Sequence, residues 1–184
     1  MGMEAMTEAI RGRLHREIQS AASGDEVAFG KIVAEHHDHM RRVCRVITRD
    51  DALADDAVMT AWDIAWRKLG SLRDPTRLRP WLISVAANEA KRLSKRRRRR
   101  LEVEIAVDAS ERPGGVDPAT GIDRVDLRAA MARLDPDDRA LLAMRYVAGF
   151  SSVELADVVG LSPPGTRARL SRLLKRLREE LDHE

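Results

Sequence analysis

The sequence predicts an all-α protein made of two small helical domains joined by a flexible linker. Aromatic residues make up only 3% of the 184 residues, and runs of the β-branched and aromatic residues that favour strands are scarce. Alanine, leucine and arginine, which favour helices, are abundant instead. The length suits one medium domain or two small ones, and a stretch of helix-breaking residues in mid-chain favours two.

The first domain is expected over residues 25–100, after an N-terminal extension at residues 1–24. In the extension, Ile10, Leu14 and Ile18 recur every four residues and predict a short helix. Three longer series of apolar residues at helical spacing predict the helices of the domain itself. These series are Phe29, Ile32, Val33, Met40, Val43 and Ile47; Leu53, Ala57, Val58, Ala61, Trp62, Ala65 and Leu69; and Leu82, Val85, Ala86, Ala90 and Leu93.

Residues 101–122 interrupt the helical pattern. Pro113-Gly114-Gly115 and Asp117-Pro118 are strong helix breakers. Acidic residues also outnumber basic residues in this stretch. We therefore expect a flexible linker between the two domains.

The second domain is expected over residues 123–184, and capping residues mark the boundaries of its helices. The predicted helix starts are Asp135-Pro136, Ser151 with Glu154 in a capping box, and Ser162-Pro163, and the predicted helix ends are Gly149 and Gly160. The last helix has an apolar stripe of Leu170, Leu174, Leu177 and Leu181. A short helix, a tight turn and a long helix in this order predict a helix-turn-helix.

Charge is strongly segregated along the chain, although the formal net charge is only +3. Eight of the ten residues from Lys91 to Arg100 are basic, and the segment from Gly165 to Arg178 has six basic residues and no acidic one. By contrast, the segment from Asp50 to Asp63 has five aspartates and no basic residue. The basic segments suit contact with a polyanion, and the acidic segment suits a basic partner.

The last predicted helix carries side chains that suit DNA. Arg167, Arg169, Ser171 and Arg172 lie in its first turns, where a helix in the major groove reaches base edges. An arginine can donate two hydrogen bonds to one guanine edge. The alternative is a three-helix domain whose basic face is only solvated. The run from Lys95 to Arg100 is, by itself, either a solvated tail or a phosphate contact.

No pattern in the sequence indicates an enzyme. In His36-His37-Asp38-His39 only His36 and His39 share a helix face, and no cysteine or glutamate partner lies at ligand spacing. We therefore predict no catalytic site, no metal and no cofactor. Cys44 falls on an apolar stripe and is expected to be packed in the core, as are Trp62 and Trp66.

Nothing in the sequence indicates export or a membrane. No apolar run approaches the ~20 residues that span a bilayer, and the first four residues, Met1 to Glu4, do not begin a secretory signal. The single cysteine favours a reducing compartment. We expect a cytoplasmic protein without membrane insertion.

Five segments in this order resemble signatures of the extracytoplasmic-function (group IV) sigma factors of the sigma-70 class. The segment from Leu53 to Trp62 resembles "AEDLVQETF", and the segment from Arg79 to Lys91 resembles "RPWLxxIAxNxAxD". Leu134 to Arg139 and Tyr146 to Ser151 are similar to "LPxxxR" and "YxxGxS". The segment from Ser162 to Leu177 is similar to "SxGTVKSRLxRARKRL". Such a series is far more specific than a lone helix-turn-helix.

The resemblance implies a region 2-like bundle at residues 25–100 and a region 4-like helix-turn-helix at residues 123–184, with three sets of site residues. The set that binds the clamp of core RNA polymerase is Asp55, Asp56, Val58 and Met59. The set that reads the minus-ten promoter element, on the loop at 70–79 and the next helix, is Arg73, Arg77, Arg79, Trp81, Asn88, Lys91, Arg92 and Lys95. The set that binds the minus-thirty-five element is Arg167, Ala168, Arg169, Ser171 and Arg172, of which Arg169 is expected to contact a phosphate.

The function that the resemblance implies is promoter recognition and transcription initiation, with core RNA polymerase, promoter DNA and an anti-sigma protein as partners. The alternative is a free-standing helix-turn-helix repressor or activator, which has no use for the acidic helix. Three positions depart from the family pattern. Met59 occupies a position where the family usually has Gln, and Lys91 occupies one where Asp is frequent. The segment from Pro164 to Thr166 replaces the family's "GTV".

Overall fold

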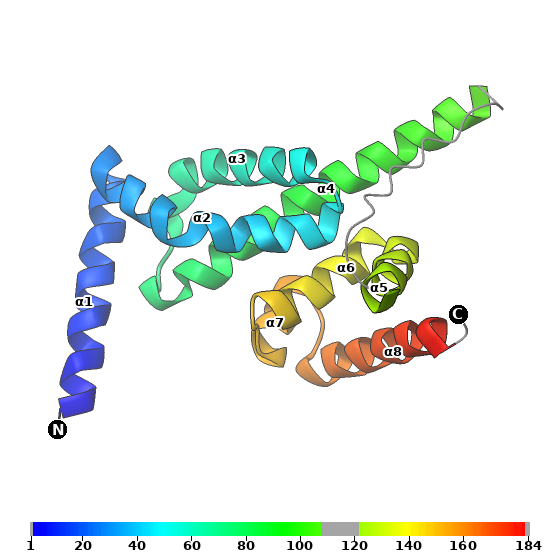
Figure 1. Cartoon of the computed structure of the whole chain (residues 1–184). Coiled ribbons are helices and arrows are strands. Elements are labelled where there is room, and N and C mark those ends of the chain that lie inside the picture. The colour runs from blue at the N-terminus through cyan, green and yellow to red at the C-terminus, as the bar shows by residue number, and fades with distance from the viewer. Residues whose placement is uncertain (1, 108–121, 183–184) are drawn as a thin grey trace.

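A computed structural model of the chain describes residues 2–107 and 122–182, and every regular element in these two ranges is helical (Figure 1). The first unit comprises α1 (Gly2–Ala22), α2 (Glu26–Thr48), α3 (Asp51–Lys68), η1 (Leu69–Ser71), η2 (Pro75–Arg77) and α4 (Leu78–Val107). The second unit comprises α5 (Ile122–Arg133), α6 (Pro136–Leu142), η3 (Ala143–Val147), α7 (Ser152–Val159) and α8 (Pro163–Asp182). The all-α prediction is confirmed.

The first unit is a bundle in which α2, α3 and α4 pack against one another. Asp25 begins α2 by accepting hydrogen bonds from the backbone N–H groups of Val27 and Ala28, and Asp50 begins α3 by accepting one from Leu53. Such caps satisfy amide groups that have no partner inside the helix. The apolar stripes meet in the core, where the buried side chains include Met40, Val43, Cys44, Ile47, Ala57, Val58, Leu82 and Ala90.

The predicted N-terminal helix is present as α1. It packs against α2 and against the short turns η1 and η2 that join α3 to α4. Ile18 and Ala21 are buried at this contact, and Leu14 is partly buried. The C-terminal half of α1 therefore supports the loop that leads into α4.

α4 is longer than the sequence analysis expected. It continues through Val107, so residues 101–107 are helical and do not belong to a flexible linker. The first strong helix breaker in this part of the sequence is Pro113, and nothing before it forces the helix to stop. The remaining residues of the expected linker, 108–121, lie outside the described residues.

In the second unit, α6, α7 and α8 begin where the capping residues predict, and α7 ends where Gly160 predicts, but α6 passes into the π-helical segment η3 before Gly149. Asp135 accepts a hydrogen bond from the N–H of Asp137 at the start of α6, and Ser151 and Glu154 form a reciprocal capping box at the start of α7. Gly160 ends α7 with φ of 67°, a left-handed conformation that favours glycine. α7, the first helix of the helix-turn-helix, is therefore fixed by local interactions at both of its ends.

The core of the second unit differs from the predicted stripe of α8 at two positions. Leu170 and Leu177 are buried, but Leu174 and Leu181 lie at the edge of the stripe and are 36% and 37% exposed. Leu173 is buried instead. The actual stripe follows 3.6 residues per turn and therefore drifts away from strict four-residue spacing.

The two units lie against each other. α6 contacts both α2 and α4, and η3 contacts α2. The buried apolar residues of both units form one continuous cluster. α8 lies on the side of the second unit that faces away from α2 and α4 (Figure 1).

Candidate nucleic-acid and partner interfaces

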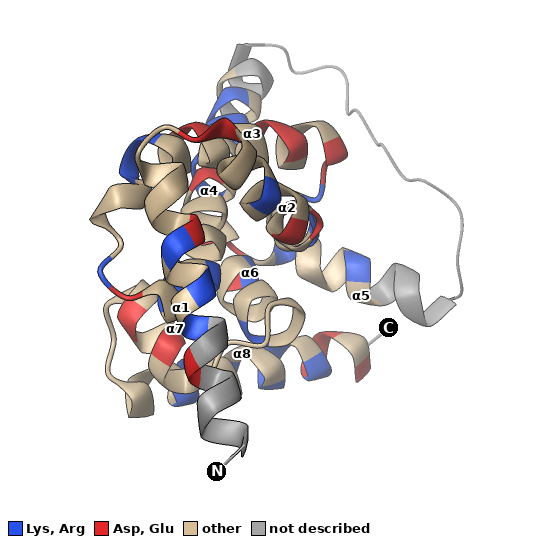
Figure 2. Ribbon diagram, turned by 90° about the vertical axis from the view of Figure 1, so that its left-hand side faces the viewer, with Lys and Arg blue, Asp and Glu red and all other residues tan. Residues whose placement is uncertain are grey.

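One face of α3 is acidic (Figure 2). Asp55, Asp56, Met59 and Asp63 are exposed on this helix. Asp55 is paired with Arg41 of α2, at 2.5 Å between Oδ1 and Nε, and the hydrogen bond from this arginine lowers the pKa of the Asp55 carboxyl. Within the described part of the chain, Asp56 and Asp63 form no ion pair and remain available to a cationic partner.

Val58 does not belong to this surface. Its side chain is fully buried in the core between the helices of the first unit. It follows Ala54 and Ala57 on the inner stripe of α3, so the helical period places it opposite the acidic face. The exposed part of the expected set is therefore Asp55, Asp56 and Met59.

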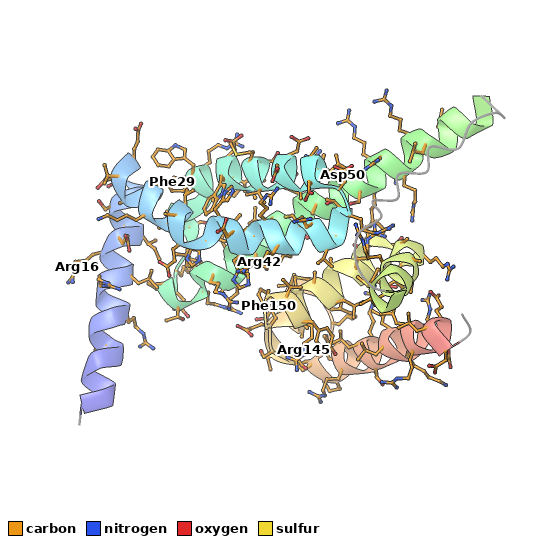
Figure 3. All side chains as sticks on the ribbon, in the orientation of Figure 1. Arg16, Phe29, Arg42, Asp50, Arg145 and Phe150 are labelled. Carbon is orange, nitrogen blue, oxygen red and sulfur yellow. The ribbon has the colours of Figure 1, made fainter. Side chains whose placement is uncertain are left out.

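An aromatic groove continues the same side of the bundle. Phe29 packs edge-to-face against Trp62 and Trp66, with ring centroids 5.7 Å and 4.8 Å apart. The groove has a volume of about 490 Å³ and is lined by Glu26, Phe29, Gly30, Trp62, Asp63, Trp66 and Arg67. Trp66, expected in the core, is 39% exposed. Figure 3 shows Phe29 at one end of the bundle and Asp50 at the other.

The loop between α3 and α4 presents three arginines. Arg73 is exposed and forms no ion pair within the described residues. Arg77 is paired with Asp157 of α7, at 2.5 Å between Nη2 and Oδ2. Arg79 donates a hydrogen bond of 2.5 Å to the backbone carbonyl of Ala148. Two of the three arginines of this loop therefore contact the second unit.

On the polar side of α4, too, some side chains contact the second unit and others do not. Asn88 is exposed and makes no hydrogen bond with another described residue, and Arg92 pairs with Glu89 on the same helix. Lys91 and Lys95 both contact Asp137 of α6, at 3.7 Å and 2.5 Å between Nζ and the carboxylate oxygens. Trp81, near the start of the helix, is partly buried.

The arginine run of α4 makes specific contacts. Arg97 is paired with Asp50, the N-cap residue of α3, at 2.5 Å. Arg98 is paired with Asp135, the N-cap residue of α6, at 3.1 Å. Both aspartates keep their capping bonds. The beginning of the run is therefore attached to the starts of two other helices.

Arg139 is a buried cation between the two units. Its Nε donates a 2.7 Å hydrogen bond to the carbonyl of Ile47 near the C-terminus of α2, and its Nη1 donates one of 2.6 Å to the carbonyl of Leu134. The residue is 7% exposed, and burial lowers the pKa of its guanidinium. A cation at the C-terminal end of a helix also interacts favourably with the helix dipole. In the sequence, Arg139 stands out only as the last residue of the segment from Leu134 that resembles a family signature.

The recognition helix α8 presents Arg167, Ala168, Ser171 and Arg172 to solvent. Arg169 differs from them because its guanidinium is paired with Asp138 of α6, at 2.6 Å between Nη2 and Oδ1. Asp138 is only 16% exposed at its side chain. Arg169 therefore holds α8 against α6, whereas the other four residues are open to a ligand.

The histidine cluster and the cysteine have structural surroundings. His37 accepts a hydrogen bond of 3.3 Å from the indole of Trp62 at its Nδ1. Cys44 is fully buried, and burial raises the pKa of its thiol to about 12. In residues 2–107 and 122–182, no three acidic, histidine or cysteine side chains are grouped so that they could hold a metal ion. The same residues contain no helix that is long and apolar enough to cross a membrane.

These surfaces define a helical protein with a bundle that carries an acidic face and a basic helix, followed by a helix-turn-helix with an open recognition helix. Comparison with known families gives the same division. Residues 32–100 match the family described as sigma-70 region 2, and residues 124–177 match the family described as sigma-70, region 4.

Individual relatives agree. The chain is 31% identical to the RNA polymerase sigma factor CarQ of Myxococcus xanthus, over 86% of this chain and 91% of CarQ. It is also 31% identical to the probable RNA polymerase sigma factor RfaY of Xanthomonas campestris pv. campestris, over 95% of this chain but only 45% of the length of RfaY. The protein belongs to the sigma-70 family, in its extracytoplasmic-function branch, and is an RNA polymerase sigma factor.

A solved structure has the same fold. The sigma factor RpoE of Bartonella quintana, determined in complex with the anti-sigma factor NepR, superposes with a TM-score of 0.66. It is 25% identical, and the match covers 84% of this chain and 96% of RpoE. The fold class that the sequence predicts is therefore confirmed in three dimensions.

Proposed function

We propose that this sigma factor reads the minus-thirty-five promoter element with α8 and the minus-ten element with α4 and the loop before it. The observation that carries the proposal is the open row Arg167, Ala168, Ser171 and Arg172 in the first turns of α8, which follows the capped helix α7. In a helix-turn-helix, these first turns are the part that enters the major groove. Arg172 is the candidate for a bidentate contact with guanine.

For the minus-ten element, we assign base reading to Asn88 and phosphate contacts to the cations around it. An asparagine amide both donates and accepts, so it can distinguish base edges, whereas lysine and arginine only donate. Arg73 lies in the loop that would hold an unpaired base, and Trp81 follows that loop in the first turn of α4. Arg77, Arg79, Lys91, Arg92 and Lys95 complete the basic surface.

The acidic face of α3 is the proposed contact with the clamp of core RNA polymerase. Asp56 and Met59 lie beside each other on its exposed side and lack partners in the described part of the chain, which suits a basic and partly apolar surface. Asp55 belongs to the same face but already has Arg41 as a partner. Asp56 is therefore the main electrostatic contact of this surface.

An anti-sigma protein is a further proposed partner, because RpoE of Bartonella quintana is bound by one in the structure with the same fold. We also propose that the chain acts in the cytoplasm, where core RNA polymerase and promoter DNA lie, and has no catalytic activity of its own. The competing function, a free-standing repressor or activator, gives no role to the region 2 part of the chain at residues 32–100.

Run-off transcription from genomic DNA fragments, with core RNA polymerase and the purified chain, tests the proposal. New start sites should appear only when both components are present. Footprinting should then place the chain at two elements upstream of each start. A chain that binds duplex DNA alone, and that adds no start site to core polymerase, would support the free-standing regulator instead.

A further inference from the structure

Three arginines of α4 form a line along one face of the helix. Arg92, Arg96 and Arg99 are exposed and are spaced by four and then three residues, which places them on the same side. We call this line the arginine stripe. It continues from Asn88, which lies one turn before Arg92 and is also exposed. The stripe is about 10 Å long, because each residue of an α-helix adds about 1.5 Å.

The other cations of the same segment point in other directions. Lys95 and Arg98 contact carboxylates of α6, and Arg97 contacts the N-cap carboxylate of α3. Within residues 2–107 and 122–182, Arg96 and Arg99 form no ion pair and no hydrogen bond through their side chains. These two arginines are therefore members of the run that the described fold leaves open.

The stripe lies where α4 leaves the bundle. Ser94 is the last residue of α4 that is described as buried, and residues 96–101 are all exposed. Figure 1 shows α4 continuing past the ends of α2 and α3. This end of the helix therefore projects from the bundle and offers its side chains to a large ligand.

The spacing of the stripe suits a row of phosphates. Arginines three and four residues apart on a helix repel one another, and only Arg92 has a carboxylate beside it, that of Glu89 at 2.6 Å, among the described residues. Phosphates relieve such repulsion, because the guanidinium donates charge-assisted hydrogen bonds to their oxygens. Along one strand of a duplex they recur about every 3.4 Å of the axis, so a stripe of about 10 Å spans about three of them.

The order of the chain indicates which part of the promoter this is. The proposed function assigns the minus-ten element to Asn88 and the loop before α4, and the minus-thirty-five element to α8. The stripe lies beyond Asn88, on the part of α4 that leads towards the second unit. On promoter DNA, it is therefore expected beside the duplex between the two elements.

We propose that the arginine stripe binds the phosphate backbone of the duplex between the two promoter elements, next to the minus-ten element. This inference rests on the proposed promoter-reading function. Arginine contacts with phosphates position a protein on DNA and carry no direct sequence information. The stripe thus adds affinity that is independent of sequence and fixes the direction of α4 along the duplex.

The first test measures the salt dependence of holoenzyme binding to a promoter fragment that contains both elements. Arg96→Gln/Arg99→Gln removes two charges and keeps good helix formers. Each lost phosphate contact lowers the slope of log affinity against log salt by about 0.9, so between about 50 and 200 mM salt the unaltered holoenzyme should lose about tenfold more affinity than the variant. Arg13→Gln/Arg16→Gln is the matched control, with the same spacing and charge change on exposed residues of α1, at the opposite end of the bundle (Figure 1). It should keep the salt dependence of the unaltered holoenzyme.

The second test locates the contact on the DNA. Three successive phosphates beside the minus-ten element, on the side of the minus-thirty-five element, are replaced by neutral methylphosphonates, on one strand at a time. On one of the strands, the replacement should weaken binding of the unaltered holoenzyme at least about threefold. The same replacement should change binding of Arg96→Gln/Arg99→Gln little, because the contact is already lost.

Four outcomes are informative. Equal salt dependence for the variant and the unaltered holoenzyme overturns the stripe contact and leaves the promoter-reading function intact, because Asn88 and α8 are unchanged. Equal effects of the methylphosphonates on both proteins also overturn it, since the stripe then does not touch this backbone. If the unaltered holoenzyme protects neither promoter element in a footprint, the proposed function fails, and the stripe contact fails with it. A reduced salt dependence together with insensitivity to the methylphosphonates supports the proposal.

Discussion

Neighbouring arginines of one helix can have different tasks. Arg172 projects from α8 into solvent, with one weak hydrogen bond of 3.4 Å to the carbonyl of Ala168 on its own helix. Arg169 is paired with the nearly buried Asp138. The resemblance implies a phosphate contact for Arg169, whereas the structure pairs this arginine with a carboxylate of α6. Their partners in the fold make Arg172 the candidate for DNA and Arg169 a link between α8 and α6.

We expect Arg172→Ala to weaken holoenzyme binding to the preferred promoter by about 1–3 kcal/mol and to relax base preference at one position of the minus-thirty-five element. Arg169→Ala should instead lower the thermal midpoint of the chain, since Asp138 is left without its partner. Selection from a randomised duplex library measures the first effect, and thermal denaturation followed by circular dichroism measures the second. Identical base preferences for Arg172→Ala and the unaltered chain would contradict the base contact.

Cys44 should be unreactive in the folded protein. Its thiol has a pKa of about 12 because it is buried, so at pH 8 only about one molecule in ten thousand carries the thiolate that reacts. Iodoacetamide should modify the chain quickly in urea and very slowly without it, which mass spectrometry detects. Rapid alkylation of the native chain would show that the helix packing around α2 opens readily.

At the scale of single elements, α3 separates its tasks by face. Its inner stripe of Ala54, Ala57 and Val58 closes the core of the first unit, and its outer face carries the aspartates. A substitution on the outer face therefore changes the charge of the surface without changing the packing of the bundle. This separation makes α3 suitable for a direct test of polymerase docking.

We expect Asp56→Arg to reduce the affinity of the chain for core RNA polymerase on the order of tenfold, because a positive charge replaces a negative one facing a basic partner. Helical content should not change. Glu35→Arg, an equal change of charge at an exposed position of α2, serves as the control. Fluorescence titration of labelled chain with core enzyme measures both. Equal affinities for Asp56→Arg and Glu35→Arg would remove α3 from the proposed docking surface.

Local features of the elements could be predicted from the sequence, and contacts between the units could not. The capping residues Asp135, Ser151 and Gly160 act on amide and carbonyl groups within a few positions, so their pattern is visible in the chain. The pairs Lys95–Asp137 and Arg77–Asp157 join residues 42 and 80 positions apart, with no periodic signal. For Val58, two predictions from the sequence disagree. The apolar stripe predicts a buried side chain, and the resemblance implies an exposed contact with polymerase.

At the scale of the whole molecule, the contacts between the two units and the proposed promoter reading use the same cations. Lys91, Lys95 and Arg77 are bound to carboxylates of the second unit in the free chain, whereas Asn88 and Arg73 remain open beside them. The part of the minus-ten surface that would read bases is thus accessible, whereas several of the cations that would hold phosphates are paired with the second unit. We expect the two units to separate within holoenzyme, so that the base-reading and the phosphate-binding residues of this surface both contact the same DNA strand.

Strand opening therefore depends on Asn88 in holoenzyme. An extruded base loses a few kcal/mol of stacking and pairing, which its binding site has to offset. Asn88 is exposed on α4, the helix that follows the loop containing Arg73, and its amide can both donate to and accept from a base edge. We expect Asn88→Ala holoenzyme to bind duplex promoter nearly as well as the unaltered enzyme but to open it poorly, as measured by permanganate reactivity of unpaired thymines. A template with a pre-melted bubble should recover much of the loss, because the cost of unpairing has been removed.

Arg92→Ala is the comparison, since loss of a phosphate contact should weaken binding to both templates alike. If Asn88→Ala opens duplex promoters as well as the unaltered enzyme, α4 serves only as a phosphate contact and base reading lies elsewhere on the loop.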